Sequence, residues 1–386
     1  MKISEDIKYI GVNDHDIDLF EGQYDVPLGM AYNSYVILDE KTAVMDTVDG
    51  NFADEWLKNL KEALDGRTPD YLVIHHMEPD HSACIEAFVK EYPETEITAN
   101  AQAFRMLSQF YPSLTNIRKK TIANNEKLSL GKHELTFIFA PMVHWPEVMM
   151  SYDSYDKVLF SADAFGKFGA NDVEDPEGWA CEARRYYFGI VGKYGAQTQA
   201  VLKKAASLDI QTICSLHGPV LTKDLSVYLN LYDKWSSYQP EEEGIFIAYA
   251  SIYGHTKEAA YALYDALKQG GYDNVHISDL AREDMYECVE DAFRYSKLVL
   301  ASVTYDTSVM PCMREFISHL THRGYKNRTV AFIENGTWAP MAAKAMKTML
   351  EGSQNLTYLE PVVSIKSAMN EQNKEEIAAL SAALKN

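Results

Sequence analysis

The sequence predicts an α/β protein with two domains, and three observations support this fold class. The chain has 386 residues, which is enough for two domains of ordinary size. Apolar, strand-like runs alternate with segments of helical periodicity in both halves. Between the halves, residues 240–244 combine a proline, three glutamates and a glycine, a composition typical of a linker. We therefore expect one domain at residues 1–241 and a second at residues 244–386.

The first half mixes strand and helix signals. Residues 33–48 alternate apolar and polar side chains as a β-hairpin does, and residues 51–64 have the spacing of an amphipathic helix. The apolar run at residues 71–74 is typical of a buried strand. Two strand-rich sheets with helices on the outside would fit this pattern, although the pattern alone does not require them.

The second half has a simpler pattern. The apolar run at residues 245–250 has the length of a strand that is buried on both faces, and helical periodicity follows at residues 256–269. Further strands are expected near Val275, at residues 298–302 and 330–333, and near Val362. Five strands that alternate with helices predict a doubly wound parallel sheet.

Composition and charge exclude several classes of protein. Apolar residues make up 47% of the chain, but no run of about eighteen of them occurs, so no membrane helix is expected. A formal net charge of -20 without a basic stripe argues against a nucleic-acid partner. Residues 1–6 contain no apolar signal core, so we expect a cytoplasmic protein.

The cysteines agree with a reducing compartment. They are scattered and never form a C-x-x-C motif: Cys84, Cys181, Cys214, Cys288 and Cys312. This spacing predicts neither a disulfide framework nor a thiolate iron–sulfur site within the chain. We expect reduced thiols, and any electrons that the protein uses must come from a separate partner.

The most informative segment is residues 76–81, which follow the strand expected at 71–74. It contains four side chains that can bind metals, namely His76, Glu78, Asp80 and His81. Burying them without a cation would cost several kcal/mol for each unpaired charge. One ion rarely takes four ligands from so short a run, so the spacing suggests two metals. Structural zinc prefers Cys and His, whereas this mixture of imidazole and carboxylate also suits iron or manganese.

Three further candidate ligands each follow an apolar run, and they are His144, Asp163 and His217. Taken alone, a histidine at a strand end is more often an ordinary polar residue than a metal ligand. Asp163 taken alone would most often be the N-cap of a helix. Together with residues 76–81 they predict a dinuclear site at one rim of a sheet. His75 is excluded, because alternation along the strand would point it away from its neighbour.

The order of these motifs resembles the flavodiiron proteins over roughly the first 220 residues. The motifs are H-x-E-x-D-H at 76–81, H-W-P at 144–146, S-A-D at 161–163 and H-G-P at 217–219. The zinc hydrolases of the wider metallo-β-lactamase superfamily usually carry His where this chain has Glu78. The resemblance implies a metallo-β-lactamase-like αββα sandwich for the first domain.

The resemblance also implies a role for each ligand. One iron would be bound by His76, Glu78 and His144, the other by Asp80, His81 and His217, with Asp163 bridging the two. The chain departs from the family at Glu21, where some members carry a His close to the irons. This departure concerns the surroundings of the irons, which tune activity, and not the ligands themselves.

A second group of motifs lies in the second half, at the ends of the predicted strands. The first loop opens a helix, and a helix N-terminus with short hydroxyls offers an anion site, although a capped helix after a tight turn is an alternative. This loop resembles the phosphate loop of flavodoxins and so implies FMN. Loops after the third and fourth strands would flank the isoalloxazine, with Tyr305 or Trp338 packed against it. The expected FMN residues are Ser251, Ile252, Tyr253, Gly254, His255, Thr256, Ser302, Val303, Thr304, Tyr305, Asp306, Asn335, Gly336, Thr337 and Trp338.

The expected function combines the two sites. Reducing dioxygen to water takes four electrons, of which a diferrous pair stores about two and a reduced flavin about two. The resemblance implies two irons and one FMN per chain, and reduction of dioxygen to water, of nitric oxide to nitrous oxide, or both, in protection against oxygen or nitrosative stress. The sequence does not choose between the gases.

The resemblance further implies particular partners. These are an external electron donor, either a rubredoxin-like protein or a reduced deazaflavin, and a second copy of the chain in a head-to-tail homodimer or a tetramer. Two alternatives remain open from the sequence: a zinc-dependent hydrolase with a flavodoxin-like appendage, and a non-catalytic electron carrier or oxygen sensor.

Overall fold

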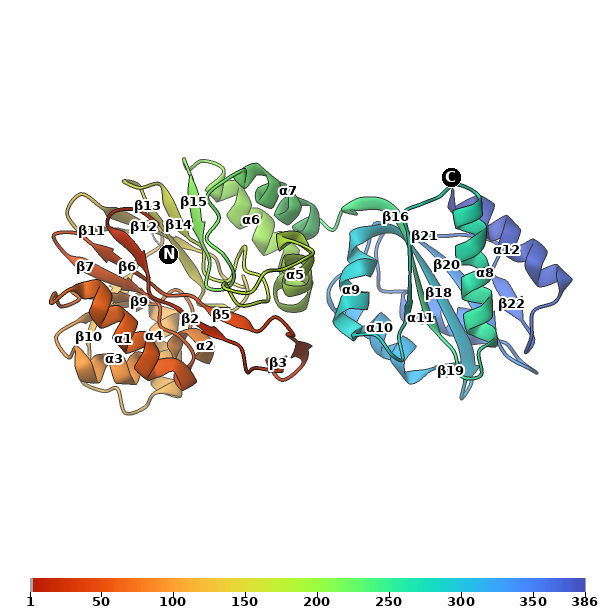
Figure 1. Ribbon diagram of the computed structural model, residues 1–386, viewed down its shortest axis with the longest axis horizontal. Helices are drawn as coiled ribbons and strands as arrows, with labels where there is room; N and C mark the ends of the chain where they lie inside the picture. The colour runs from red at the N-terminus through yellow and green to blue at the C-terminus, as the bar shows by residue number, and fades with distance from the viewer. Residues whose placement is uncertain (1–2, 386) are drawn as a thin grey trace. The chain divides into compact units, whose positions relative to one another are not determined.

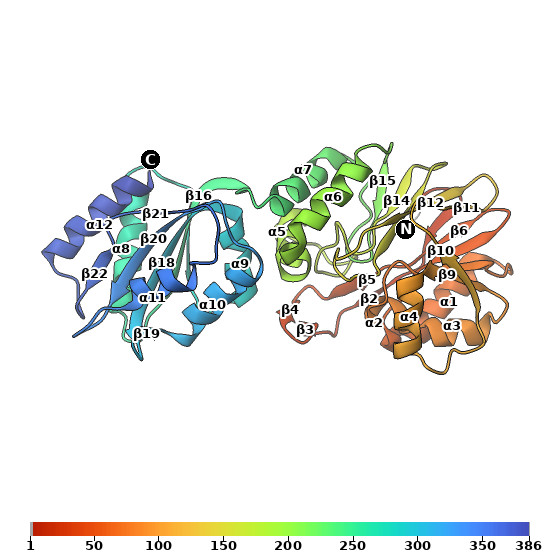
Figure 2. The ribbon, with the colours of Figure 1, turned by 180° about the vertical axis from the view of Figure 1, so that it is seen from behind.

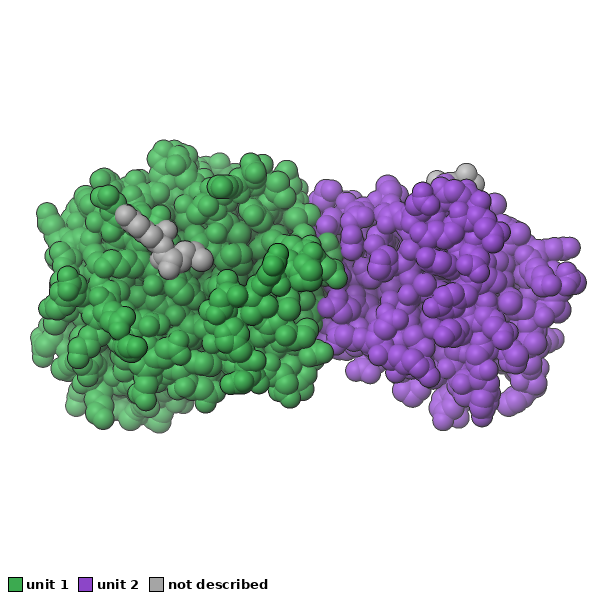
Figure 3. Space-filling model, viewed as in Figure 1, with its two compact units in different colours: residues 1–233 green, residues 234–386 purple. Residues whose placement is uncertain are grey.

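The structure is a computed structural model that describes residues 3–385. It contains two compact units, residues 1–233 and residues 234–386, which Figure 3 shows in different colours. The division falls within α7 (Leu225–Ser236). The two units are described separately below.

The first unit contains two main sheets. One sheet has six strands in the order β1 (Ile7–Tyr9), β6 (Tyr35–Leu38), β7 (Thr42–Met45), β8 (Tyr71–Val73), β9 (Glu96–Asn100) and β10 (Arg118–Ile122). The other has five, in the order β11 (Lys127–Ser129), β12 (Glu134–Phe139), β13 (Met149–Asp153), β14 (Val158–Phe160) and β15 (Thr212–Cys214). Two short ribbons, β2 (Val12–Asp14) with β5 (Met30–Tyr32) and β3 (Leu19–Phe20) with β4 (Tyr24–Asp25), complete this unit.

The core of the first unit lies between its two sheets. One buried cluster joins Ile37 and Val73 of the first sheet to Phe137, Met149 and Phe160 of the second. Figures 1 and 2 show helices on the outer sides of the sheet pair. They are α1 (Ala53–Leu64), α2 (Pro79–Ser82), α3 (Ile85–Glu91), α4 (Ala101–Phe110), α5 (Trp179–Tyr186), α6 (Gly195–Ala205) and α7. This layering is the predicted αββα sandwich.

The second unit is built on a parallel sheet. Its main path runs β17 (Val275–Asp279), β16 (Glu242–Ala250), β18 (Tyr295–Tyr305), β20 (Arg328–Asn335) and β21 (Leu356–Tyr358). The strand β22 (Val363–Ile365) also pairs parallel to β20, and β19 (Ser308–Val309) pairs antiparallel to β18. The register sets Ala250 opposite Ser302 and Val303 opposite Asn335, so β16, β18 and β20 end at the same edge.

Helices cover both faces of this sheet, as a doubly wound fold requires. On one face, Ile245 and Ile247 of β16 share a buried cluster with Leu263 of α8 (His255–Gln269) and Leu380 of α12 (Glu371–Leu384). On the other face, Phe246 meets Phe316 of α10 (Pro311–His322) with ring centroids 6.3 Å apart. The remaining helices are α9 (Met285–Arg294) and α11 (Ala342–Met349). The predicted fold class is confirmed.

Two local expectations are wrong. The strand expected at residues 298–302 extends to Tyr305, because β19 pairs with Thr304 and Tyr305 and prolongs the sheet. Residues 242–244 of the expected linker belong to β16. This strand begins at Glu242 because Glu242 pairs with Tyr295 and forms an ion pair with Arg294. Within residues 3–385, no helix combines the length and the apolar character needed to span a membrane.

Candidate dinuclear metal centre and flavin pocket

The seven predicted metal ligands come together at one rim of the first unit. His76 and Glu78 lie in the loop after β8, and Asp80 and His81 lie on α2. The other three follow strands of the second sheet: His144 after β12, Asp163 after β14 and His217 after β15. Because β14 and β15 are parallel neighbours, their carboxyl ends deliver Asp163 and His217 to the same place.

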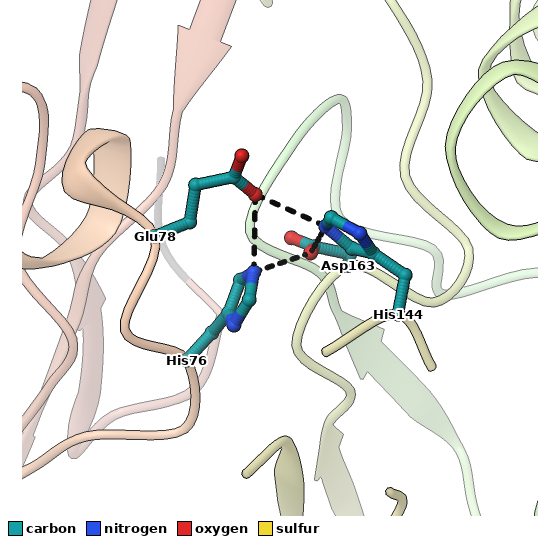
Figure 4. Close-up of side chains that lie close together, drawn as sticks. All are labelled: His76, Glu78, His144 and Asp163. Atoms are coloured by element: carbon teal, nitrogen blue, oxygen red, sulfur yellow. Dashed lines mark hydrogen bonds and ion pairs between the residues drawn. The ribbon is translucent and has the colours of Figure 1, made fainter. Parts of the chain in front are cut away.

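Four of these side chains form a first metal-capable group, shown in Figure 4: His76, Glu78, His144 and Asp163. Glu78 Oε2 lies 3.1 Å from His76 Nε2 and 3.0 Å from His144 Nε2. Asp163 Oδ2 lies 3.3 Å and 3.2 Å from the same two nitrogens. Two imidazole nitrogens and two carboxylate oxygens therefore surround one point.

A second metal-capable group consists of Asp80, His81 and His217. The two Nε2 atoms of His81 and His217 face each other at 2.9 Å. Asp80 Oδ2 lies 3.2 Å from His81 Nε2 and 3.3 Å from His217 Nε2. All three residues are buried.

Asp163 connects the two groups. Its Oδ2 faces the first group, whereas its Oδ1 lies 3.6 Å from His81 Nε2 and 3.9 Å from His217 Nε2. The residue is 1% exposed, and neither carboxylate oxygen has a hydrogen-bond partner among residues 3–385. One carboxylate oxygen directed at each group is the arrangement that a bridging ligand requires.

The hydrogen bonds of the histidines indicate where their lone pairs point. His217 Nδ1 donates to the carbonyl oxygen of Ala31 at 2.8 Å, and His76 Nδ1 donates to Glu147 Oε1 at 2.8 Å. A neutral imidazole held in this way carries its lone pair on Nε2, which points into the cluster. Lone pairs that converge on carboxylate oxygens repel one another unless a cation lies between them, so the residues present fit a pair of metal ions.

The electrostatics of the cluster lead to the same conclusion. Burial lowers the pKa of His144, but Asp163 and Glu78 outweigh burial and raise the pKa to about 9. Burial also opposes ionisation of Asp163, but His76 and His144 outweigh it and hold the pKa of Asp163 below its usual range. The carboxylates therefore stay ionised and attract positive charge, which protons or metal ions supply.

The second unit contains a pocket of about 630 Å³ at the carboxyl ends of β16, β18 and β20. This volume lies within the range of small-molecule sites. Two aromatic side chains beside it are almost fully exposed, Tyr253 at 92% and Trp338 at 90%. Rings left uncovered by the protein on the walls of a pocket suit a planar aromatic ligand. No lysine or arginine occurs among the described residues that line this pocket, so an anion there would depend on backbone, hydroxyl and imidazole donors, the last from His255.

Most of the residues expected around FMN line this pocket. Two of the fifteen, Gly254 and Ser302, do not. Gly254 has a φ of 98° and is the N-cap of α8, where it fixes the turn, and Ser302 is fully buried and donates to the carbonyl oxygen of Val303. The sequence interpretation missed four lining residues, Thr307, Ala339, Met341 and Ser367. Ser367 follows β22, so the rule that ligands bind at strand ends could have found it.

Comparison with known proteins identifies the family. The ODP family beta lactamase model matches residues 30–218. The chain is 30% identical to an anaerobic nitric oxide reductase flavorubredoxin of Vibrio vulnificus over 87% of this chain and 70% of that relative. This chain belongs to the flavodiiron protein family. A nitric oxide reductase of Moorella thermoacetica is 29% identical over 93% of the flavodiiron chain and 91% of its own length.

Solved structures share the fold of this flavodiiron protein. The flavodiiron protein of Giardia intestinalis superposes with a TM-score of 0.92 and 24% identity, covering 99% of this chain and 95% of its own. Rubredoxin:oxygen oxidoreductase of Desulfovibrio gigas superposes with a TM-score of 0.91 at 24% identity. The match covers 100% of this chain and 98% of the other. Both units of the flavodiiron fold are therefore present.

Aromatic side chains surround the metal cluster of this flavodiiron chain. Phe20, Tyr32 and Tyr186 pack around the ring of His217, with centroids 5.4, 6.0 and 5.4 Å away. Trp145 packs edge-on against His76 at 5.1 Å. These contacts hold the imidazoles in place and limit the access of water to the cluster.

Two residues singled out from the sequence lie beside the cluster. His75 points away from it, since its Nδ1 bonds to Asp46 and its Nε2 to Ser151 at 2.8 Å. Glu21 lies in the exposed turn between β3 and β4. Partial desolvation and the carboxylate of Glu78 raise the pKa of Glu21 to about 7. Glu21 thus belongs to the electrostatic surroundings of the candidate metal centre.

Proposed function

We propose that the protein reduces dioxygen to water, nitric oxide to nitrous oxide, or both, at a diiron centre supplied with electrons by FMN. The observation that carries this proposal is the position of Asp163, whose two oxygens face two separate metal-capable groups. The relatives named nitric oxide reductases support nitric oxide as a substrate.

In this proposal the seven clustered side chains hold two irons per chain. His76, Glu78 and His144 hold one iron, Asp80, His81 and His217 hold the other, and Asp163 bridges them. When bound, the irons and the flavin together supply the four electrons that dioxygen reduction needs, or the two that join two nitric oxide molecules. Histidine and carboxylate ligands without thiolates suit non-haem iron.

The pocket at the carboxyl ends of β16, β18 and β20 holds FMN. The backbone N–H groups at the start of α8 and the hydroxyls of Ser251 and Thr256 bind its phosphate. Tyr253 and Trp338 lie on the pocket walls and pack against the ring system. Thr304 positions this wall, because its Oγ1 accepts from the backbone N–H groups of Met341 and Ala342 at 2.9 and 3.2 Å.

The chain's own residues prepare the metal centre for a small gas. Phe20, Tyr32 and Tyr186 exclude bulk water from the side of His217, which strengthens the electrostatic interactions inside. The hydrogen bonds of His76 and His217 at Nδ1 orient both imidazoles before metal binding.

An external electron donor, a rubredoxin-like protein or a reduced deazaflavin, completes the proposal. The chain has no C-x-x-C motif of its own, and one relative is named a flavorubredoxin. We propose a head-to-tail homodimer, or a tetramer of such pairs, in which the flavin of one subunit serves the partner's metal centre. No disulfide joins the cysteines of residues 3–385, which supports a cytoplasmic location.

The zinc hydrolase is the weaker alternative. The relatives are named as reductases. Hydrolysis transfers no electrons, so a hydrolase would not need a flavin in the pocket of the second unit. Glu78 in place of the usual His of the zinc enzymes also argues against it.

Metal analysis and gas kinetics test the proposed function. Protein purified without added metal is expected to contain about two irons and one FMN per chain. The chemically reduced protein is expected to consume dioxygen without releasing peroxide, or to consume nitric oxide. The measurements are metal analysis, flavin absorbance and gas electrodes under anaerobic conditions. Zinc in place of iron, or no gas consumption by protein loaded with iron and FMN, would contradict the proposal.

A further inference from the structure

One buried carboxylate near the candidate metal centre is not among the predicted ligands. Glu147 lies in the loop that carries His144, and its side chain is 0% exposed. Its Oε1 accepts from the ring of His76 at Nδ1, 2.8 Å away, and from the backbone N–H of Met77, 2.9 Å away. In the described part of the chain its Oε2 has no hydrogen-bond partner and no lysine or arginine pairs with it. Among the described residues, the charge of Glu147 is therefore compensated by His76 and by the N–H of Met77, without a lysine or arginine.

The second metal-capable group has no such carboxylate behind its imidazoles. His217 Nδ1 donates to the backbone carbonyl oxygen of Ala31, which is neutral. His81 Nδ1 has no hydrogen-bond partner among residues 3–385. A carboxylate behind a coordinating imidazole fixes its tautomer and raises its basicity, and a neutral carbonyl does so less. The two metal positions thus differ in the electron donation that their histidines can give.

The fold holds Glu147 in place independently of any metal. The side-chain amide of Asn100 donates to the backbone carbonyl oxygen of Glu147 at 2.5 Å. The other end of the same amide is the N-cap of α4, where its Oδ1 accepts from Gln102 N at 3.0 Å and Ala103 N at 2.9 Å. Glu147 is therefore tied to the first sheet through Asn100 and contacts His76 from a fixed position.

We propose that Glu147 is a positioning residue that makes the two metal positions unequal. It fixes the tautomer of His76 and strengthens the position formed by His76, Glu78 and His144, so this position binds a divalent ion more tightly than the other. The inference rests on the dinuclear centre of the proposed function, and it assigns the order in which the two positions fill.

The test is a Co²⁺ titration of metal-free protein, followed by visible absorption and calorimetry. The wild-type protein is expected to bind two ions in two steps of different affinity. The variant Glu147→Gln keeps an oxygen that accepts from both N–H groups and removes the charge. It is expected to weaken the tighter step by about 10- to 100-fold and to leave the weaker step unchanged.

Asp153→Asn is the matched control. Asp153 on β13 is also a buried carboxylate bonded to a buried histidine, with its Oδ2 3.0 Å from His133 Nδ1. Neither residue belongs to the two metal-capable groups above, whereas His133 forms a separate metal-capable group with Asp6 and Asp156. Any Co²⁺ bound there would be lost from a His133→Gln variant and kept in Glu147→Gln. This variant is expected to lose stability and to keep both Co²⁺ steps, which separates the effect on metal binding from a general effect on the fold.

The possible outcomes are distinct. Unchanged steps in Glu147→Gln, or equal weakening of both steps, would overturn the inference. Fewer than two Co²⁺ ions in the wild-type protein would overturn the dinuclear centre and the inference with it. If Glu147→Gln fails to fold, Glu147→Asp, which retracts the carboxylate from His76, must weaken the same step or the inference is wrong. Because the titration needs no turnover, a lack of gas reduction contradicts only the proposed function.

Discussion

At the scale of single residues, Asp163 shows why the candidate centre requires cations. Its carboxylate is 1% exposed, and in the part of the chain that the structure describes neither oxygen has a hydrogen-bond partner. A buried carboxylate costs several kcal/mol unless positive charge compensates it, and the oxygens of Asp163 face the Nε2 atoms of four cluster histidines. A metal ion bound to each oxygen would supply positive charge and remove this cost. The burial of Asp163 and the direction of its two oxygens are therefore those expected of a metal ligand.

Removal of one ligand tests the assignment of the second metal position. His81→Ala is expected to lower the iron content from about two per chain to one or fewer and to abolish gas reduction, since His81 faces both Asp80 and His217. FMN content should not change. Metal analysis and flavin absorbance on the same sample provide the measurement. Retention of both irons together with activity would show that His81 is not a ligand.

A second prediction concerns pH and His133, which is not among the seven candidate metal ligands. His133 is buried. The charged groups around it are Asp6, Asp39, Asp153, Asp156 and Lys132. Burial lowers its pKa, but Asp153 and Asp6 outweigh burial and raise it above 6.5. The stabilisation is therefore complete below the unfolded pKa of about 6.5 and is lost as pH rises through the folded pKa.

The measurement for His133 is the urea midpoint of unfolding between pH 6 and pH 9. The wild-type midpoint is expected to fall over this range more steeply than that of His133→Gln. Asp153→Asn, which leaves the histidine without its main partner, should lower the free energy of unfolding by about 1–3 kcal/mol at pH 6. Parallel pH profiles for wild type and His133→Gln would refute the role of this histidine.

At the scale of secondary-structure elements, the start of α8 is the proposed binding site for the FMN phosphate. The turn at Gly254, with φ 98°, lets the chain enter the helix directly after β16. Replacing both Ser251 and Thr256 with Ala removes two hydroxyls from the pocket wall. It is expected to weaken FMN binding by roughly 10²- to 10⁴-fold, because each hydrogen bond to a charged group contributes about 1.5–3 kcal/mol. Equilibrium dialysis of FMN measures the loss.

Ser302→Ala is the control for this pair. Its hydroxyl is buried and donates to the carbonyl oxygen of Val303, and it does not line the pocket. Its removal should leave the FMN affinity unchanged. An equal loss of affinity in Ser302→Ala would mean that the effect reflects the fold of the strand end and not contact with the ligand.

Periodicity and motif order gave much of this architecture, and the errors have physical causes. The hairpin at β6 and β7, the helix α1 and the alternating second unit follow from spacing alone. The extension of β18 depends on its pairing with β19, a contact that local sequence does not encode. The role of Glu147 could not be predicted from the sequence, because a single acidic residue in a loop forms no motif. Its contact with His76 exists only in the folded chain.

At the scale of the whole molecule, the proposed dimer makes a prediction about mixed subunits. His81→Ala lacks a complete metal centre, and the Ser251→Ala/Thr256→Ala protein, dialysed free of FMN and assayed without added FMN, lacks flavin. Each alone should therefore be inactive. If one subunit's flavin serves the partner's metal centre, refolded one-to-one mixtures should recover about a quarter of wild-type activity, since half of the dimers are mixed and each has one working pair. No recovery would contradict the head-to-tail arrangement.

The candidate ligands are also divided between the two sheets of the first unit. His76 follows a strand of the first sheet, whereas Asp163 and His217 follow strands of the second. Bound metal would therefore act as a cross-link between the layers, because only the folded sandwich brings its ligands together. A chelator should lower the melting temperature of this unit and leave that of the flavin-binding unit unchanged, as calorimetry can show. The supply of iron would then govern how long each molecule survives in the cell, in addition to how fast it works.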